Sequence, residues 1–91
     1  MNMSDITNNA ARSRYEMVVD GHTAFAEYKL APGMIEFTHT VVPKELGGRG
    51  LGSKIAAFVL ADAKARGLKV KPTCPFIAAY LQKHPDAATT V

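Results

Sequence analysis

The sequence predicts a small α+β domain in which two helices cover a mixed sheet. Between Arg14 and Val42, hydrophobic and polar residues alternate with the period of two that is typical of strands with one buried face. After a glycine-rich loop, residues 51–66 carry hydrophobic side chains at helical spacing. The chain has 91 residues, 47% of them hydrophobic, which suits one domain with a small core. We expect an antiparallel three-stranded meander, a loop, a helix, a fourth strand and a C-terminal helix.

Two turn signals divide the alternating segment into three strands. The Asp-Gly pair at residues 20–21 is typical of a two-residue hairpin turn, and the Pro-Gly pair at residues 32–33 marks a second turn. The third strand is expected over residues 34–42. Such a meander has at least one hydrophobic face that other elements must cover.

The second half of the chain predicts helix, strand and helix. The first helix covers residues 51–66, and Gly67 is a typical residue at a helix C-terminus. A short fourth strand is expected over residues 68–73. Pro75 suits the first turn of a second helix, which is expected to continue to about Lys83.

The N-terminal segment, residues 1–12, is rich in Asn, Ser and Thr. We expect it to be a flexible tail and residues 13–91 to form a single minimal domain. The segment lacks the apolar stretch of a secretory signal, and one cysteine cannot form an internal disulfide. We therefore expect a cytoplasmic protein.

Charge and hydropathy argue against several classes of partner. The formal net charge is +3, but the sequence contains no block of consecutive Lys or Arg and no interleaved aromatic motif for nucleic acid. It also contains no apolar run of about 18 residues that would span a membrane. The three histidines do not have metal-ligand spacing. We expect neither a nucleic-acid nor a membrane partner, and no bound metal.

A loop with four glycines in six residues, from Gly47 to Gly52, lies between the third strand and the first helix. Glycines let backbone N–H groups approach an anion at a helix N-terminus, where unpaired donors and the helix dipole favour negative charge. Phosphate is the obvious candidate, and a tight turn without a ligand is the alternative. A Walker A loop would need Lys before Ser or Thr, whereas Ser53 precedes Lys54 here. A dinucleotide fingerprint would follow the first strand of a βαβ unit, and this loop follows a meander.

The loop resembles the acetyl-CoA pyrophosphate loop of the GNAT N-acetyltransferases, whose pattern is Gln/Arg-x-x-Gly-x-Gly/Ala. Gly50 and Gly52 match the two small positions, and Gly47 departs from the pattern by standing at the Gln/Arg position. Four further segments resemble, in order, a short branch of this superfamily that lacks the usual N-terminal helices: Phe37-Thr38-His39-Thr40, Cys74-Pro75-Phe76, Tyr80 and His84-Pro85. The resemblance covers residues 14–85 and implies a GNAT-like fold with the fourth strand parallel to the third.

The resemblance implies a binding site for acetyl-CoA or CoA. In the family, the pantetheine arm pairs with the strand before the loop, and the pyrophosphate meets the loop N–H groups. The implied strand residues are Thr40, Val41 and Val42. The implied loop residues are Gly48, Arg49, Gly50, Leu51, Gly52, Ser53 and Lys54, with Arg49 and Lys54 adding charge-assisted contacts unless they belong to a solvated loop face.

Three residues are candidates for catalysis. The resemblance makes Tyr80 the acid that protonates the CoA thiolate, the alternative being a core aromatic with a satisfied hydroxyl. Cys74, at the start of the second helix, could line the thioester pocket, accept the acetyl group, or be a small buried hydrophobe. His39 is expected on one strand face with Ile35, Phe37 and Val41, while Glu36 and Thr38 point the other way. We predict His39 as the base because imidazole titrates nearest neutrality and the residue lies closer to the loop, with a hydrogen-bonded core histidine as the alternative. Glu36 resembles, less clearly, an occasional strand carboxylate of the family, and its alternative is a solvent-facing strand residue.

The function that the sequence favours is transfer of an acetyl group from acetyl-CoA directly to an amine. A CoA-binding module with little or no catalysis and a small protein-interaction domain with a ligand-free turn are the alternatives. Without the N-terminal helices, the acceptor side would be an open cleft that suits a protein, a polyamine or a small amine. The sequence does not predict which acceptor is used, nor the oligomeric state.

Overall fold

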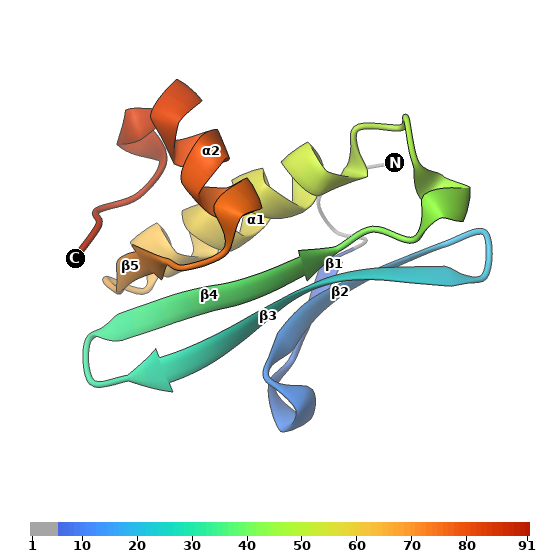
Figure 1. Ribbon diagram of the computed structural model, residues 1–91. Helices are drawn as coiled ribbons and strands as arrows, with labels where there is room; N and C mark the ends of the chain where they lie inside the picture. The colour runs from blue at the N-terminus through green and yellow to red at the C-terminus, as the bar shows by residue number, and fades with distance from the viewer. Residues whose placement is uncertain (1–5) are drawn as a thin grey trace.

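The computed structural model describes residues 6–91, and Figure 1 shows how they are arranged. The elements are β1 (Ile6–Asn9), β2 (Arg14–Val19), β3 (His22–Ala31), β4 (Met34–Val41), α1 (Leu51–Ala65), β5 (Lys69–Pro72) and α2 (Pro75–Lys83), with short 3-10 turns at Ala10–Arg12, Lys44–Leu46 and Pro85–Ala87. The strands form one sheet in the order β1-β2-β3-β4-β5. Neighbours pair antiparallel from β1 to β4, and β5 runs parallel to β4. The α+β class is therefore confirmed.

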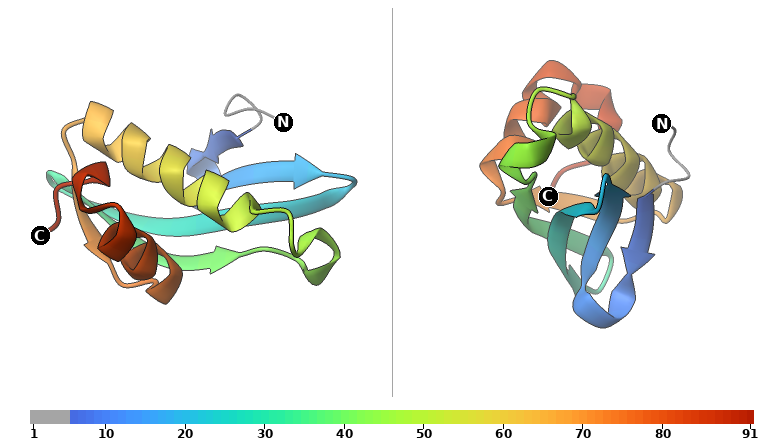
Figure 2. Two further views of the ribbon diagram at one scale, coloured as in Figure 1. Left: turned by 90° about the horizontal axis from the view of Figure 1, so that it is seen from above. Right: turned by 90° about the vertical axis from the view of Figure 1, so that its right-hand side faces the viewer.

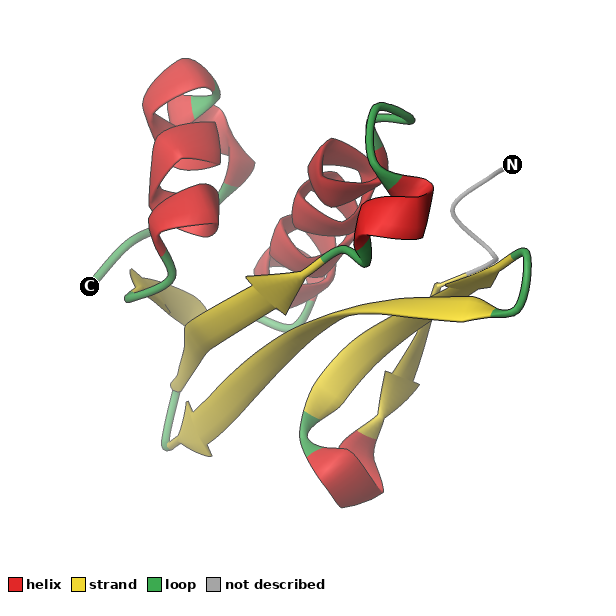
Figure 3. Ribbon diagram, turned by 45° about the vertical axis from the view of Figure 1, so that its right-hand side comes forward, coloured by secondary structure: helices red, strands yellow, loops and turns green. Residues whose placement is uncertain are grey.

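Both helices lie on the same face of the sheet, and the other face is open (Figures 2 and 3). The covered face is built from alternating strand residues, and α1 adds a stripe of hydrophobic residues at helical spacing. Because side chains alternate along a strand, the remaining strand residues, most of which are polar, lie on the open face. The fully buried side chains between the layers include Tyr15, Met17, Ile35 and Phe37 from the strands and Ile55, Val59 and Leu60 from α1.

The prediction of a flexible N-terminal tail is wrong from Ile6 onward, and residues 1–5 lie outside the described residues. Residues Ile6–Asn9 form β1, which pairs antiparallel with β2 at the edge of the sheet. Ile6 is 4% exposed and joins the core. The segment looks like a tail because its other residues are polar, but the backbone bonds to β2 make it a strand. The antiparallel meander accordingly has four strands instead of the three expected.

A β-bulge in β4 changes which side chains face the helices. Tyr28 pairs with Phe37, and the residue before it, Glu27, pairs with His39. Thr38 therefore has no residue of β3 directly opposite it in the register. Directly paired residues of neighbouring strands share a face. His39 therefore lies on the open face with Glu27.

The expectation that His39 shares a face with Ile35 and Phe37 is consequently wrong. The extra residue in β4 reverses the inward and outward alternation beyond it, so Thr40 takes the inward position and pairs with the buried Ala26. The side chain of His39 is 70% exposed. A histidine buried in the core is thereby excluded as well.

Strands β4 and β5 stay together only over a short distance. They pair from Met34 to Phe37, and the N–H of Cys74 then donates to the carbonyl of Phe37 at 2.8 Å. Beyond this bond the chain turns into α2 and leaves the sheet, as Figure 1 shows. Within the described part of the chain, no strand pairs with residues 38–41 on this side of β4.

A polar contact fastens α1 to the sheet. The buried Tyr15 of β2 donates a hydrogen bond to Asp62 of α1, and Arg66 lies 3.4 Å from both Asp62 Oδ2 and the Tyr15 hydroxyl. Burial first, and then the Asp62 carboxylate, raise the pKa of Tyr15 well above its ordinary value of 10.0. The contact fixes the C-terminal half of α1 and so helps to set where the glycine loop at its other end lies. Among residues 6–91, no helix is long and apolar enough to cross a membrane.

We expect Ile6→Ala to lower the free energy of unfolding by about 2 kcal/mol, the lower end for a large-to-small core substitution, because β1 lies at the sheet edge. The exposed neighbour Thr7 gives the matched control, since Thr7→Ala removes no core contact and should change stability by less than about 0.5 kcal/mol. Urea unfolding followed by circular dichroism measures both. Equal effects of the two substitutions would mean that β1 contributes nothing to the core.

Candidate active site

Two glycines of the loop are required by the backbone conformation. Gly48 and Gly50 have φ angles of +78° and +70°, in the left-handed region that residues with a Cβ rarely adopt. No neighbouring atom would obstruct a Cβ at either position, so space is not the constraint. Gly50 is the N-cap of α1 and provides no side-chain hydrogen bond to the first turn. The N–H groups of that turn therefore lack partners within the helix and are available to an anion.

Gly52 is required for a different reason. A Cβ at this position would lie 2.7 Å from Cζ of Phe76, which is closer than real contacts allow. The missing side chain lets the Phe76 ring of α2 rest directly on the first turn of α1. The loop glycines thus have two roles, one in backbone conformation and one in helix packing.

Two hollows adjoin at this contact between the helices. The first, of about 300 Å³, lies over the glycine loop, and the second, of about 430 Å³, lies between the start of α1 and α2. Ser53 and Phe76 line both hollows, so the two are neighbours. The loop hollow is otherwise lined by Val42, Leu46, Gly47, Gly48, Gly50, Leu51 and Gly52, and the second hollow by Ala79, Tyr80, Lys83 and His84.

Tyr80 faces the second hollow together with Phe76 and His84, and their predicted shared helix face is confirmed. The rings of Tyr80 and His84 stack at 4.4 Å between centroids, with 33° between their planes. The hydroxyls of Tyr15 and Tyr28 donate to Asp62 and Asn8, whereas that of Tyr80 has no partner among residues 6–91. It is therefore free to donate to a bound group.

Cys74 is the N-cap of α2 and is 3% exposed. Its thiol lies 3.3 Å from the hydroxyl of Thr40, which the bulge turns toward the helices. The predicted position of Cys74 at the end of a strand and the start of a helix is confirmed. Cys74 and Thr40 meet where β4 and β5 separate, beside the backbone of residues 38–41.

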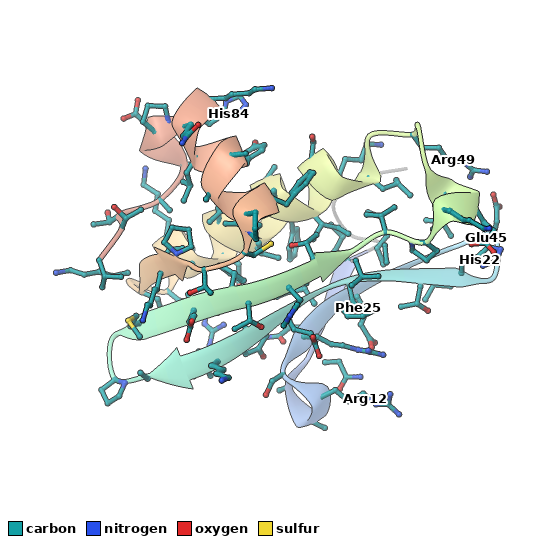
Figure 4. The ribbon with its side chains drawn as sticks, viewed as in Figure 1. Arg12, His22, Phe25, Glu45, Arg49 and His84 are labelled. Atoms are coloured by element: carbon teal, nitrogen blue, oxygen red, sulfur yellow. The ribbon has the colours of Figure 1, made fainter. Side chains whose placement is uncertain are left out.

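The cations of the loop are arranged differently from the expectation. Arg49 forms an ion pair of 2.6 Å with Asp20, which ties the loop to the turn between β2 and β3. Figure 4 shows Arg49 and His22 at this same end of the molecule. Lys54 is exposed and lines neither hollow, whereas Lys83 of α2 lines the second. The sequence does not single out Lys83, because the resemblance points only to cations of the loop, although Lys83 lies three residues after Tyr80 on one helix face.

His39 is not brought together with Tyr80 or Cys74. It lies on the open face, where its Nδ1 is 3.5 Å from a carboxylate oxygen of Glu27. Figure 4 shows the two sides of the sheet, with His84 among the helices and Arg12 on the opposite side. The described residues contain no group of three His, Cys, Asp or Glu side chains that could hold a metal ion.

The uncapped helix start, the strand edge that separates from its neighbour and the hydroxyl in the hollow form a site whose chemistry suits an anionic, extended ligand. A family model described as GCN5-related N-acetyl-transferase matches residues 14–90. The chain belongs to this family, and the resemblance to the GNAT N-acetyltransferases is confirmed. The family transfers acetyl groups and generally uses acetyl-CoA. No curated protein matches the sequence.

We expect Gly52→Ala to displace the Phe76 ring, because the exposed ring can swing away more easily than the backbone can shift. The ring would then enter the hollows, and affinity for CoA should fall about tenfold in isothermal titration. The crowding between the new methyl group and Phe76 costs about 1 kcal/mol of stability, and the better helix propensity of alanine contributes a similar amount. We therefore expect little net change in the free energy of unfolding.

The double substitution Gly52→Ala with Phe76→Ala should restore affinity, because no ring remains to be displaced. Gly50→Ala serves as the comparison, since its defect comes from the backbone angle and Phe76→Ala should not relieve it. Rescue of both variants, or of neither, would contradict this explanation of Gly52.

Proposed function

We propose that the protein is an acetyl-CoA-dependent N-acetyltransferase that moves the acetyl group directly from the thioester to an amine. The observation that carries the proposal is the unpaired edge of β4 leading to the uncapped start of α1, within a chain of the GCN5-related family. A free strand edge can form hydrogen bonds with an extended chain that contains amides, and a helix start can form them with phosphate. In CoA the pantetheine arm, which contains amides, is followed by the pyrophosphate.

In this proposal the pyrophosphate of acetyl-CoA occupies the loop hollow and accepts hydrogen bonds from N–H groups between Gly48 and Ser53. The pantetheine arm pairs with the backbone of residues 40–42, along the edge that β5 leaves free. Lys83 is the cation best placed to meet a phosphate in the second hollow. Arg49 must leave Asp20 to contribute, and an exposed ion pair of this kind costs only about 0–1 kcal/mol to break.

Direct transfer needs a neutral amine, a thioester beside it and a proton for the departing sulfur. The amine nitrogen attacks the thioester carbonyl carbon, the C–N bond forms, and the C–S bond breaks. Tyr80 donates its hydroxyl proton to the CoA thiolate and later recovers a proton from solvent. The excess proton on nitrogen leaves to a base or to water. No step requires a covalent bond to the protein, so we assign Cys74 to the lining of the thioester site beside Thr40.

The alternative is a CoA-binding module with little or no turnover. His39 favours this alternative, because the structure separates the predicted base from Tyr80 and Cys74 by the thickness of the sheet. An acetyltransferase releases CoA from acetyl-CoA when an amine is present, whereas a binding module releases little or none. The cytoplasmic location expected from the sequence stays a prediction.

Isothermal titration with acetyl-CoA tests the cofactor site. We expect binding with a Kd well below about 1 mM, and no heat at that concentration would contradict both proposals. Gly50→Asp should weaken binding about 100-fold or more, because a carboxylate would stand where the pyrophosphate binds. Gly50→Asn is the matched control: Asn has nearly the same shape, tolerates a left-handed backbone and caps helices, but is uncharged. Similar losses in the two variants would show that charge at this position is irrelevant.

Turnover with a panel of amines tests the transfer chemistry. We expect Tyr80→Phe to lower kcat by about 10- to 100-fold with an unchanged Kd for acetyl-CoA, since only the proton donor is lost. Tyr28→Phe removes a hydroxyl that donates to Asn8 and lines neither of these two hollows, and it should leave kcat unchanged.

Cys74→Ser should retain activity within about tenfold, because direct transfer needs no thiol nucleophile. Mass spectrometry of the protein after incubation with acetyl-CoA should then show no acetyl group on Cys74. Loss of all turnover in Cys74→Ser, together with an acetylated thiol in the unmodified sequence, would replace direct transfer with a two-step route. CoA release that never exceeds spontaneous hydrolysis would favour the binding module.

A further inference from the structure

We propose that His84 is a positioning residue that holds the ring of Tyr80 in place at the hollow between α1 and α2. The inference rests on the proposed function, because it concerns the residue that supplies a proton in that transfer. Its basis is the stack between the two rings, whose centroids lie 4.4 Å apart with 33° between the ring planes. Both side chains line the same hollow, and Figure 4 shows His84 near the end of α2.

The side chain of Tyr80 is not fixed by a hydrogen bond. The hydroxyls of Tyr15 and Tyr28 are anchored by other side chains, whereas that of Tyr80 has no protein partner among residues 6–91. The Tyr80 ring packs partly against the hydrophobic core, and within the described residues its only aromatic stack is with His84. A proton donor needs a free hydroxyl, so the position of this hydroxyl must come from the packing of its ring.

The end of α2 fixes where His84 lies. Its N–H donates to the carbonyl of Tyr80 at 2.9 Å, and its own carbonyl accepts a bond of 3.0 Å from the N–H of Ala87. Pro85 disfavours helical backbone at the residue before it, and His84 leaves the helical region with a φ of −134° and a ψ of 68°. The imidazole is therefore attached to a backbone that is held on both sides.

The short turn after His84 is in turn held against α1. The Nζ of Lys64 in α1 donates to the carbonyl of Asp86 at 2.9 Å, and Ala87 and Ala88 pack against the core. His84 is therefore fixed to the body of the protein and does not belong to a frayed helix end. The pair His84-Pro85, which the transfer chemistry leaves without a role, gains one as the support of Tyr80.

A histidine suits this position chemically. The residue is exposed, and imidazole can stack through the face of its ring while its nitrogens stay hydrated. An exposed aromatic stack contributes little to the stability of the whole fold. The loss of the stack should therefore be visible at the Tyr80 ring and in catalysis, with the fold retained.

NMR spectra of the tyrosine rings test the stack directly. The ring current of the imidazole should shift the ring protons of Tyr80 upfield, and Tyr80→Phe identifies these signals by their loss. His84→Ala should abolish the shift, whereas His84→Phe should keep a shift of the same sign, because a phenyl ring can stack in the same way. The signals of Tyr15 and Tyr28 should not change and serve as controls for the fold. Unchanged Tyr80 signals in His84→Ala would overturn the inference.

Turnover separates a positioning role from acid–base chemistry of the imidazole. With an amine that is acetylated, His84→Ala should lower kcat about fivefold and leave the Kd for acetyl-CoA within about twofold, because the proton donor remains but is less well placed. His84→Phe should return kcat to within about twofold of the unmodified protein, since it replaces the stack but not the imidazole. The matched control is Gln82→Ala, an exposed neighbour that does not line the hollow, and it should leave kcat unchanged.

A double substitution tests whether His84 acts through Tyr80. In a Tyr80→Phe background, His84→Ala should lower kcat no further, as expected for two residues that act as a unit. A further loss would overturn the inference, and so would a His84→Phe variant as impaired as His84→Ala, which would mean that the imidazole itself is required. If no amine releases CoA from acetyl-CoA, the proposed function fails, and the Tyr80 ring signals still decide whether His84 holds the ring.

Discussion

The hydrogen bond from the N–H of Cys74 to the carbonyl of Phe37 is the last one that joins β5 to β4. Beyond it, Pro75 begins α2, and the chain leaves the sheet. The backbone of β4 then has a free edge over residues 38–41, and α2 leans across it toward the start of α1. The free edge, the buried Cys74 and the hollow lined by Tyr80 all follow from this separation. If β5 continued beside β4, its side chains and backbone would fill the same space.

A second constraint acts on the same strand. The bulge at Thr38 turns Thr40 toward the helices, where it contacts the thiol of Cys74, and turns His39 toward the open face. One extra residue thus gives each face of the sheet its own set of polar groups. The helical side has a hydroxyl, a thiol and unpaired backbone donors, and the open side has an imidazole and two carboxylates.

Both constraints depend on α1 being held firmly against the sheet. Helix α1 is anchored in its C-terminal half by the contact between Tyr15 and Asp62, and in its first turn by the Phe76 ring that rests on Gly52. The Arg49 and Asp20 pair adds a weaker link between the loop and the turn after β2. The contact between Tyr15 and Asp62 is part-buried and resists solvent competition, whereas the pair of Arg49 and Asp20 is exposed and can exchange with a phosphate.

Local features of the site could be predicted from the sequence because they depend on residues close together in the chain. The start of α1 after Gly50, the start of α2 at Pro75 and the shared face of Phe76, Tyr80 and His84 all follow from helical spacing and helix-end preferences. The family follows from the order of short motifs, each of which is local.

Tertiary structure decided the features that depend on pairing between distant segments. The face of His39 is set by its register with Glu27, and β1 exists because its backbone bonds to β2, although only Ile6 reaches the core. Arg49 is engaged by Asp20, which lies 29 residues earlier. A period-two pattern predicts which residues alternate, but one unpaired residue reverses every face beyond it, and only the partner strand shows where that residue lies.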